Sequence, residues 1–72
     1  MKIEILEWKN HTIEAVLIEE QTLEEVAESH PFDDYIGMII DGHYGVAYFD
    51  FDTQKAEFTK TSKEEAEKYA LA

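Results

Sequence analysis

Residues 35–60 alternate between apolar and polar side chains, and this period of two is typical of a β-sheet. The predicted strands span 35–41, 46–52 and 55–60, joined by two-residue turns at 43–44 and 53–54. Successive side chains of a strand point to opposite faces, so one face collects Ile36, Met38, Ile40, Ala47, Phe49, Phe51, Ala56 and Phe58. A slip of one residue would exchange the two faces, so the pattern strongly specifies this register.

The first 18 residues predict a hairpin that enlarges this sheet. Residues 2–8 and 12–18 are typical of strands, and Asn10-His11 between them suits a tight turn because both residue types tolerate positive φ. The resulting register pairs Trp8 with Ile13, Leu6 with Ala15, Ile5 with Val16 and Ile3 with Ile18. A helix over 13–20 is the alternative interpretation of the second segment.

Two short helices are indicated by capping boxes, in which a Thr or Ser hydroxyl accepts from the backbone N–H three residues later. Thr22 with Glu25 begins one helix, which Pro31 ends, and Ser62 with Glu65 begins the other. Helices this short need a sheet to pack against. We therefore predict an α+β fold with a mostly antiparallel sheet of about five strands, in the order ββαβββα, and both helices on the Phe-rich face. At 72 residues, the chain has room for one domain, residues 1–72.

Charge is the feature that bears most on function. The chain has 17 acidic residues, 6 lysines, no arginine and no cysteine, and its net charge is −11. Residues 11–52 hold eleven acids and no lysine. Phosphate groups attract Lys and Arg, so we expect neither direct binding to nucleic acid nor adhesion to an anionic membrane. The longest apolar run has four residues, and no secretory stretch is present, so we expect a cytoplasmic protein.

These observations lead to the hypothesis of an acidic, non-enzymatic protein-binding module with a basic protein as its partner. In its concrete form it inhibits a nucleic-acid-binding protein by imitating the phosphate backbone, in the manner of phage-borne inhibitors of host defence. The expected acidic surface comprises Glu24, Glu25, Glu28, Asp33, Asp34, Asp41, Asp50 and Asp52. Tyr44, at a predicted turn, and Tyr48, on the open sheet face, are the expected aromatic anchors.

No catalytic residue, cofactor or metal site is predicted. The three histidines lie in separate predicted loops, and no glycine-rich phosphate loop is present. Asp50 and Asp52 are two residues apart on a predicted strand and would point the same way, as two ligands of one cation do. The residues that follow do not match a calcium-binding loop, because Lys55 stands where such a loop needs glycine.

One segment resembles a known family. Asp41-Gly42-His43-Tyr44-Gly45-Val46-Ala47-Tyr48-Phe49, followed by a strand and by Thr61-Ser62-Lys63-Glu64-Glu65-Ala66, is similar to the hairpin–strand–helix of HicB-type antitoxins. The likeness covers less than half of the chain, which lacks the Pro and Gly-Cys positions typical of that family after the second strand. It implies an antitoxin-like module that binds a small basic toxin ribonuclease.

A further alternative is a structural or accessory domain that associates with itself. An exposed sheet face or edge would pair two copies as a homodimer, which would also offset the thin core of so small a chain. The acidic residues would then serve solubility alone.

Overall fold

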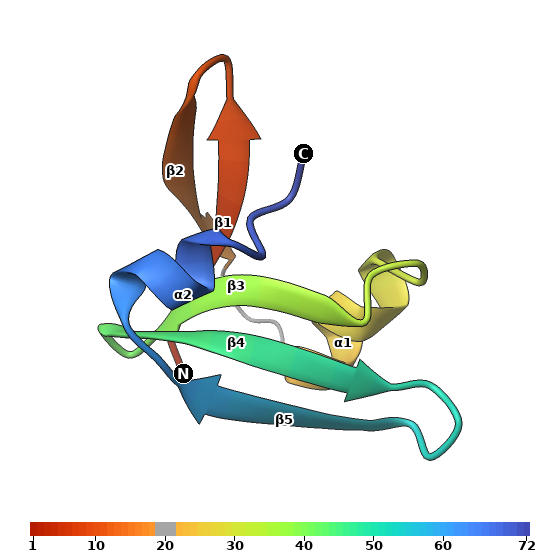
Figure 1. Ribbon diagram of the computed structural model, residues 1–72. Helices are drawn as coiled ribbons and strands as arrows, with labels where there is room; N and C mark the ends of the chain where they lie inside the picture. The colour runs from red at the N-terminus through yellow and green to blue at the C-terminus, as the bar shows by residue number, and fades with distance from the viewer. Residues whose placement is uncertain (19–21) are drawn as a thin grey trace.

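The computed structural model describes residues 1–18 and 22–72, which form a five-stranded antiparallel sheet and two short helices (Figure 1). The elements are β1 (Ile3–Lys9), β2 (Thr12–Ile18), α1 (Leu23–Ser29), β3 (Tyr35–Ile40), β4 (His43–Asp50), β5 (Lys55–Lys60) and α2 (Lys63–Glu67). The strand order is β2-β1-β3-β4-β5, so the N-terminal hairpin joins the three later strands through β1. The predicted α+β class, strand number and element order are confirmed.

The N-terminal hairpin has the predicted register. Trp8 pairs with Ile13 and Leu6 with Ala15, around a turn in which Asn10 has φ 59°. Asn tolerates this left-handed conformation better than most residues. The alternative helix over 13–20 is wrong for residues 13–18, which belong to the strand β2, and its last two residues lie outside the described part of the chain.

The turn between β3 and β4 lies two residues earlier than predicted, at Asp41-Gly42. Their φ values are 49° and 84°, and this pair of positive φ angles is what a two-residue hairpin turn requires. Ile36 consequently pairs with Ala47, and Tyr35 pairs with Tyr48. This register differs from the predicted one by an even number of residues. The side chains predicted to share a face of β3 and β4 therefore still do so.

The strand β4 ends at Asp50, two residues before its predicted end. The Asp50 Oδ1 atom accepts hydrogen bonds from the backbone N–H groups of Asp52, at 3.0 Å, and Thr53, at 3.3 Å. An aspartate that bonds its own backbone in this way favours a turn over a strand. Phe51, predicted in the core, therefore lies in the turn with 42% of its surface exposed.

The main core fills the space between the Phe-rich face and α1. Phe49, Met38 and Ile36 contribute from the sheet, and Val26, which is fully buried, contributes from α1. The helix begins with the predicted capping box, because the Thr22 hydroxyl accepts from the Glu25 N–H and the Glu25 carboxylate accepts from the Thr22 N–H. Satisfying these otherwise unpaired donors stabilises a helix of only two turns.

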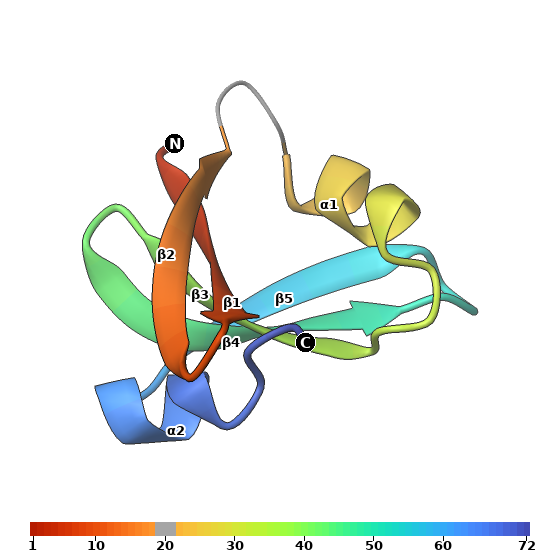
Figure 2. The same ribbon diagram turned by 90° about the horizontal axis from the view of Figure 1, so that it is seen from above.

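The prediction that both helices pack on one face is wrong, because α2 covers the opposite face of the sheet. Figure 2 shows α1 and α2 on opposite sides of the strands β3 to β5. The buried Ala66 of α2 lies over Gly37, whose neighbours Ile36 and Met38 face α1. Only a residue without a side chain leaves room for a helix at this point, and the apolar pattern of the strands carries no sign of it.

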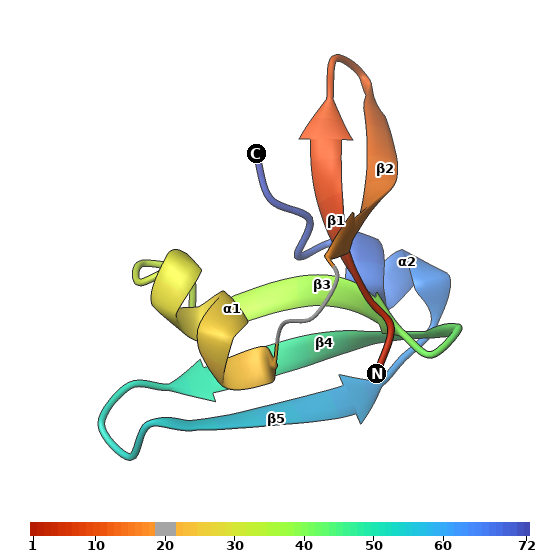
Figure 3. The same cartoon turned by 180° about the vertical axis from the view of Figure 1, so that it is seen from behind.

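The segment after α2 fills a gap in the sheet. β1 and β3 pair only over Ile3–Ile5 and Met38–Ile40, and the chain end enters where they separate (Figure 3). The Leu71 N–H donates to the Leu6 carbonyl oxygen at 2.9 Å, and the Trp8 N–H donates to the Leu71 carbonyl oxygen at 2.7 Å. These bonds satisfy backbone groups of β1 that β3 does not reach.

We predict that Gly37→Ala destabilises the protein by about 1–3 kcal/mol, the usual cost of overfilling a packed site. A Cβ atom there would collide with the Ala66 carbonyl oxygen and approach Leu6. Urea unfolding followed by circular dichroism measures the change. Gly42→Asn is the matched control, because a Cβ atom at Gly42 meets no atom within 4 Å and Asn tolerates its positive φ. Equal stabilities for the two variants would contradict the close packing of α2.

Candidate protein-binding site

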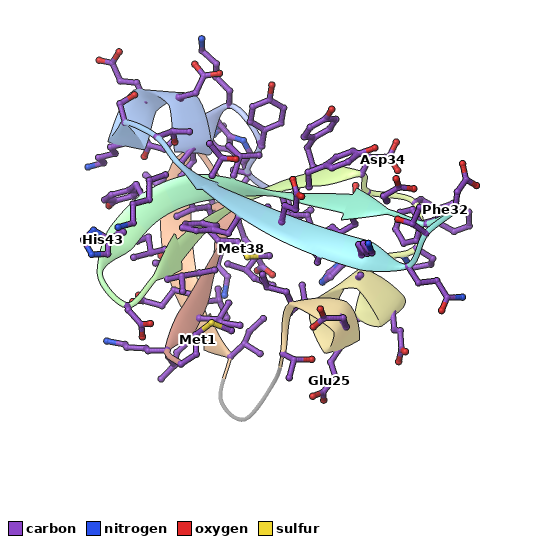
Figure 4. The ribbon with its side chains drawn as sticks, turned by 90° about the horizontal axis from the view of Figure 1, so that it is seen from below. Met1, Glu25, Phe32, Asp34, Met38 and His43 are labelled. Carbon is purple, nitrogen blue, oxygen red and sulfur yellow. The ribbon has the colours of Figure 1, made fainter. Side chains whose placement is uncertain are left out.

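Seven of the eight predicted acids lie at one end of the molecule, around α1 and the turn after β4. We call this region the acidic end: Glu24, Glu25, Glu28, Asp33, Asp34, Asp50 and Asp52. The loop after α1 is tied to β4 by a hydrogen bond of 2.9 Å from the Phe49 N–H to the Asp34 carbonyl oxygen. Figure 4 shows Asp34 and Phe32 at this end and His43 at the other. Tertiary structure thus brings together carboxylates from three separate segments.

Asp41 does not belong to this group. It lies in the turn before β4, whereas Asp50 ends that strand, and eight strand residues separate the two positions by roughly 24 Å. The Asp41 Oδ1 atom accepts a hydrogen bond of 2.9 Å from the Lys2 N–H, and the Asp41 N–H donates to the Lys2 carbonyl oxygen at 2.9 Å. Its role is to join the turn to the start of the chain.

Three tyrosines form a contiguous row on the face of the sheet opposite α1. The rings of Tyr35 and Tyr48 have centroids 5.0 Å apart, and those of Tyr35 and Tyr69 are 5.6 Å apart. Tyr35 and Tyr48 are direct partners on β3 and β4, while Tyr69 follows α2 and is positioned by a 2.9 Å hydrogen bond from the Gly37 N–H to its carbonyl oxygen. All three side chains remain partly exposed, so this tyrosine row is accessible.

Of the two predicted anchors, Tyr48 lies in this row and Tyr44 does not. Tyr44 is four residues earlier on β4, roughly 13 Å along the strand, and is half-buried beside the start of α2. Its carbonyl oxygen accepts a hydrogen bond of 3.0 Å from the Thr61 N–H. Tyr35 and Tyr69 were not predicted as anchors, because Tyr35 meets Tyr48 only in the register set by the Asp41-Gly42 turn.

Aspartates converge on the tyrosine row and influence its ionisation. The pKa of Tyr48 is raised above 10.0, chiefly by the negative charge of Asp50, then by partial loss of hydration and by Tyr35, Asp34 and Asp52. A negative neighbour opposes formation of the phenolate, which is itself negative. Tyr35, Tyr48 and Tyr69 together with Asp34, Asp50 and Asp52 are called the tyrosine–aspartate site from here on.

A groove of about 350 Å³ lies on the other side of Asp50, between α1 and the end of the sheet. Glu24 and Glu28 line it from α1, and Phe51 and Lys55 line it from the turn and β5. Asp50 therefore stands between the groove and the tyrosine row. The acidic end consists of two neighbouring surfaces, of which only the tyrosine–aspartate site presents a row of exposed aromatic rings.

The predicted geometry of Asp50 and Asp52 as neighbours on one strand is wrong. Asp52 lies in the turn, with its N–H bound to the Asp50 carboxylate. Within residues 1–18 and 22–72, no three or more His, Asp or Glu side chains gather in a metal-binding arrangement. The His30 Nδ1 atom lies 4.0 Å from the Asp33 Oδ2 atom.

Comparison with known proteins gives no match to a family model, to a curated protein or to a solved structure. Neither helix in the described part of the chain has the length and apolar character needed to cross a membrane. The geometry and charge of the surface are therefore the properties that bear on function.

We predict that Asp50→Asn lowers the pKa of Tyr48 toward 10.0, because Asp50 contributes most to raising it. Asn keeps an oxygen that accepts the two turn hydrogen bonds, so the turn is retained. NMR titration of the tyrosine ring carbons measures the pKa. Asp41→Asn removes the same charge at the far end of the molecule and is expected to leave the pKa of Tyr48 unchanged. Equal shifts of this pKa in the two variants would contradict the placement of Asp50 beside Tyr48.

The same raised pKa has a consequence for stability at alkaline pH. The folded state retains the Tyr48 proton more strongly than the unfolded state does. The free energy of unfolding is therefore expected to fall as the pH rises from 10.0 through the folded-state pKa of Tyr48. Urea unfolding of the wild type and of Tyr48→Phe over this pH range isolates the effect, which should be weaker in the variant.

Proposed function

We propose that the protein is a non-enzymatic protein-binding module whose tyrosine–aspartate site docks on a basic surface of a partner protein. The observation that carries this proposal is the row of three exposed tyrosines, in which the ring of Tyr35 lies beside those of Tyr48 and Tyr69, with aspartates next to it. Tyrosine is enriched among the residues that dominate binding energy in interfaces. Complementary charge speeds the encounter of two proteins and orients them.

Lysine and arginine side chains suit both components of this site. A cation over an aromatic ring is attracted by the electrons of the ring face, and a carboxylate forms charge-assisted hydrogen bonds with an ammonium or guanidinium group. Phe32, 95% exposed next to Asp33, adds an apolar contact at the same end of the molecule. A basic surface whose lysines and arginines project from it is the partner that matches this combination.

The partner class we propose is a nucleic-acid-binding protein, because such proteins gather Lys and Arg to hold phosphates. The seven carboxylates of the acidic end would take the place of phosphates in the groove of the partner. The module would then act as an inhibitor by nucleic-acid mimicry, excluding DNA or RNA from that groove. We place it in the cytoplasm, where it would meet such a partner.

The proposal predicts that neutralising the tyrosine–aspartate site abolishes partner capture, whereas neutralising acids elsewhere does not. The site variant carries Asp34→Asn, Asp50→Asn and Asp52→Asn, and the control variant with the same net charge carries Glu4→Gln, Glu64→Gln and Glu67→Gln. Each immobilised protein is incubated with lysate of the source cells, and mass spectrometry identifies what is retained. We expect the wild type and the control, but not the site variant, to retain a basic protein.

Three further measurements test the charge, the competition with nucleic acid and the aromatic anchor that the proposal requires. Added salt should release the partner, because it screens exposed charge pairs, and added duplex DNA or RNA should displace it. Tyr48→Ala should cost about 2 kcal/mol of binding free energy, as loss of an aromatic anchor does. Absence of any basic protein at low salt, or equal retention by the site and control variants, would contradict the proposed function.

A further inference from the structure

The outer edge of β2 is open to pairing with another strand. β2 is an edge strand of the sheet, and within residues 1–18 and 22–72 no strand lies on its outer side. Its sequence, Thr-Ile-Glu-Ala-Val-Leu-Ile, contains one charged residue and neither Pro nor Lys, the residues that often protect an edge. The opposite edge strand, β5, carries Lys55, Glu57 and Lys60. The two edges of this sheet are thus protected very differently.

The hydrogen bonds of the C-terminal segment establish which backbone groups of β2 point outward. The Trp8 N–H and the Leu6 carbonyl are bonded to Leu71, on the side of β1 away from β2. Trp8 pairs with Ile13 and Leu6 pairs with Ala15. Because Trp8 and Leu6 direct their backbone groups away from β2, these two pairs share no hydrogen bonds across the hairpin. The N–H and C=O groups of Ile13, Ala15 and, by the period of two, Leu17 point away from β1.

Ile13, Ala15 and Leu17 also carry apolar side chains on one face of the hairpin, which they share with Trp8, the partner of Ile13 on β1. Trp8 and Leu17 are 48% and 47% exposed, and Ala15 is also exposed. Figures 1 and 3 show the hairpin projecting from the body of the molecule, so this face and edge are accessible together. An exposed apolar face beside unpaired backbone groups is the usual form of a strand-pairing surface.

We propose that this edge pairs with the same edge of a second copy, giving an antiparallel β2–β2 dimer with a continuous ten-stranded sheet. Outward-pointing residues must face one another to exchange hydrogen bonds. A two-fold axis at Ala15 achieves this: Ala15 faces Ala15 of the second copy, and Ile13 faces its Leu17. This register pairs apolar residues on one face and sets Glu14 opposite Val16.

The distribution of charge favours contact at this edge over contact at the acidic end, and it disfavours one alternative register. Residues 1–18 contain two lysines and three glutamates, whereas residues 22–54 contain eight acids and no lysine. Two copies therefore meet away from their most acidic segment. Glu14 is the one charged residue of β2, and the Lys9 Nζ atom lies 3.9 Å from its Oε2 atom. A two-fold axis at Glu14 would instead set two carboxylates directly opposite each other, which is unfavourable.

Analytical ultracentrifugation over a wide range of concentrations tests the dimer. We expect the wild type to shift from monomer to dimer as concentration rises, and Ala15→Glu and Ala15→Lys each to lose that shift, because either puts like charges on the two-fold axis. An equimolar mixture of the two variants is expected to regain the dimer through opposite charges. Thr59→Glu, on an exposed position of β5, is the control and should dimerise like the wild type.

The outcomes that overturn the proposal are a wild type that stays monomeric at every concentration, an Ala15→Glu variant that dimerises normally, and a mixture that fails to regain the dimer. Because the mixture restores association, misfolding of a variant cannot imitate the expected result. The triple aspartate variant of the tyrosine–aspartate site should still dimerise, so this test and that of the proposed function succeed or fail separately.

Hydrogen exchange supplies a residue-level measurement of the same interface. In the monomer, the amides of Ile13, Ala15 and Leu17 face solvent and should exchange quickly, while those of Glu14 and Val16 are bonded to β1. At high protein concentration, we expect the amides of Ile13, Ala15 and Leu17 to become protected from exchange. Fast and slow exchange would then no longer alternate along β2. Unchanged exchange at these three amides in a dimeric sample would place the interface elsewhere and overturn the proposal.

Discussion

The fold and the candidate site both depend on the close approach of the C-terminal segment to β3 at Gly37. The Gly37 N–H bonds the Tyr69 carbonyl oxygen, and a side chain at Gly37 would strike Ala66. Two residues after Tyr69, Leu71 pairs with β1. This single contact region holds α2 on the sheet, fills the gap between β1 and β3, and brings Tyr69 to Tyr35.

The molecule separates its charge from its apolar contact surface. Acidic side chains from α1, the following loop and the β4–β5 turn gather at one end, while the nearly neutral hairpin of β1 and β2 projects from the body. The core between them contains no buried polar or charged residue among those described. Repulsion between carboxylates is therefore relieved by solvent at the surface and adds no desolvation cost to the interior.

Several features of the fold were predictable because they depend on residues close in sequence. The turn at Asn10 and the hairpin register follow from alternation on both sides of one turn, and the Thr22 capping box needs only four residues. The ends of β4 were harder to predict. The turns were predicted at 43–44 and 53–54, yet positive φ at Asp41 and Gly42 and the Asp50 side-chain bonds favour earlier positions at both ends.

By itself, the sequence determined the α+β class, the order of elements, the Phe-rich core face and the acidic character, because periodicity, caps and charge are local properties. The tertiary structure alone decided that α2 covers the second face, that Tyr35, Tyr48 and Tyr69 meet, and that Asp41 lies apart from the other acids. These outcomes depend on packing volume and backbone hydrogen bonds between residues distant in the chain, such as Gly37 and Ala66, which no local pattern encodes.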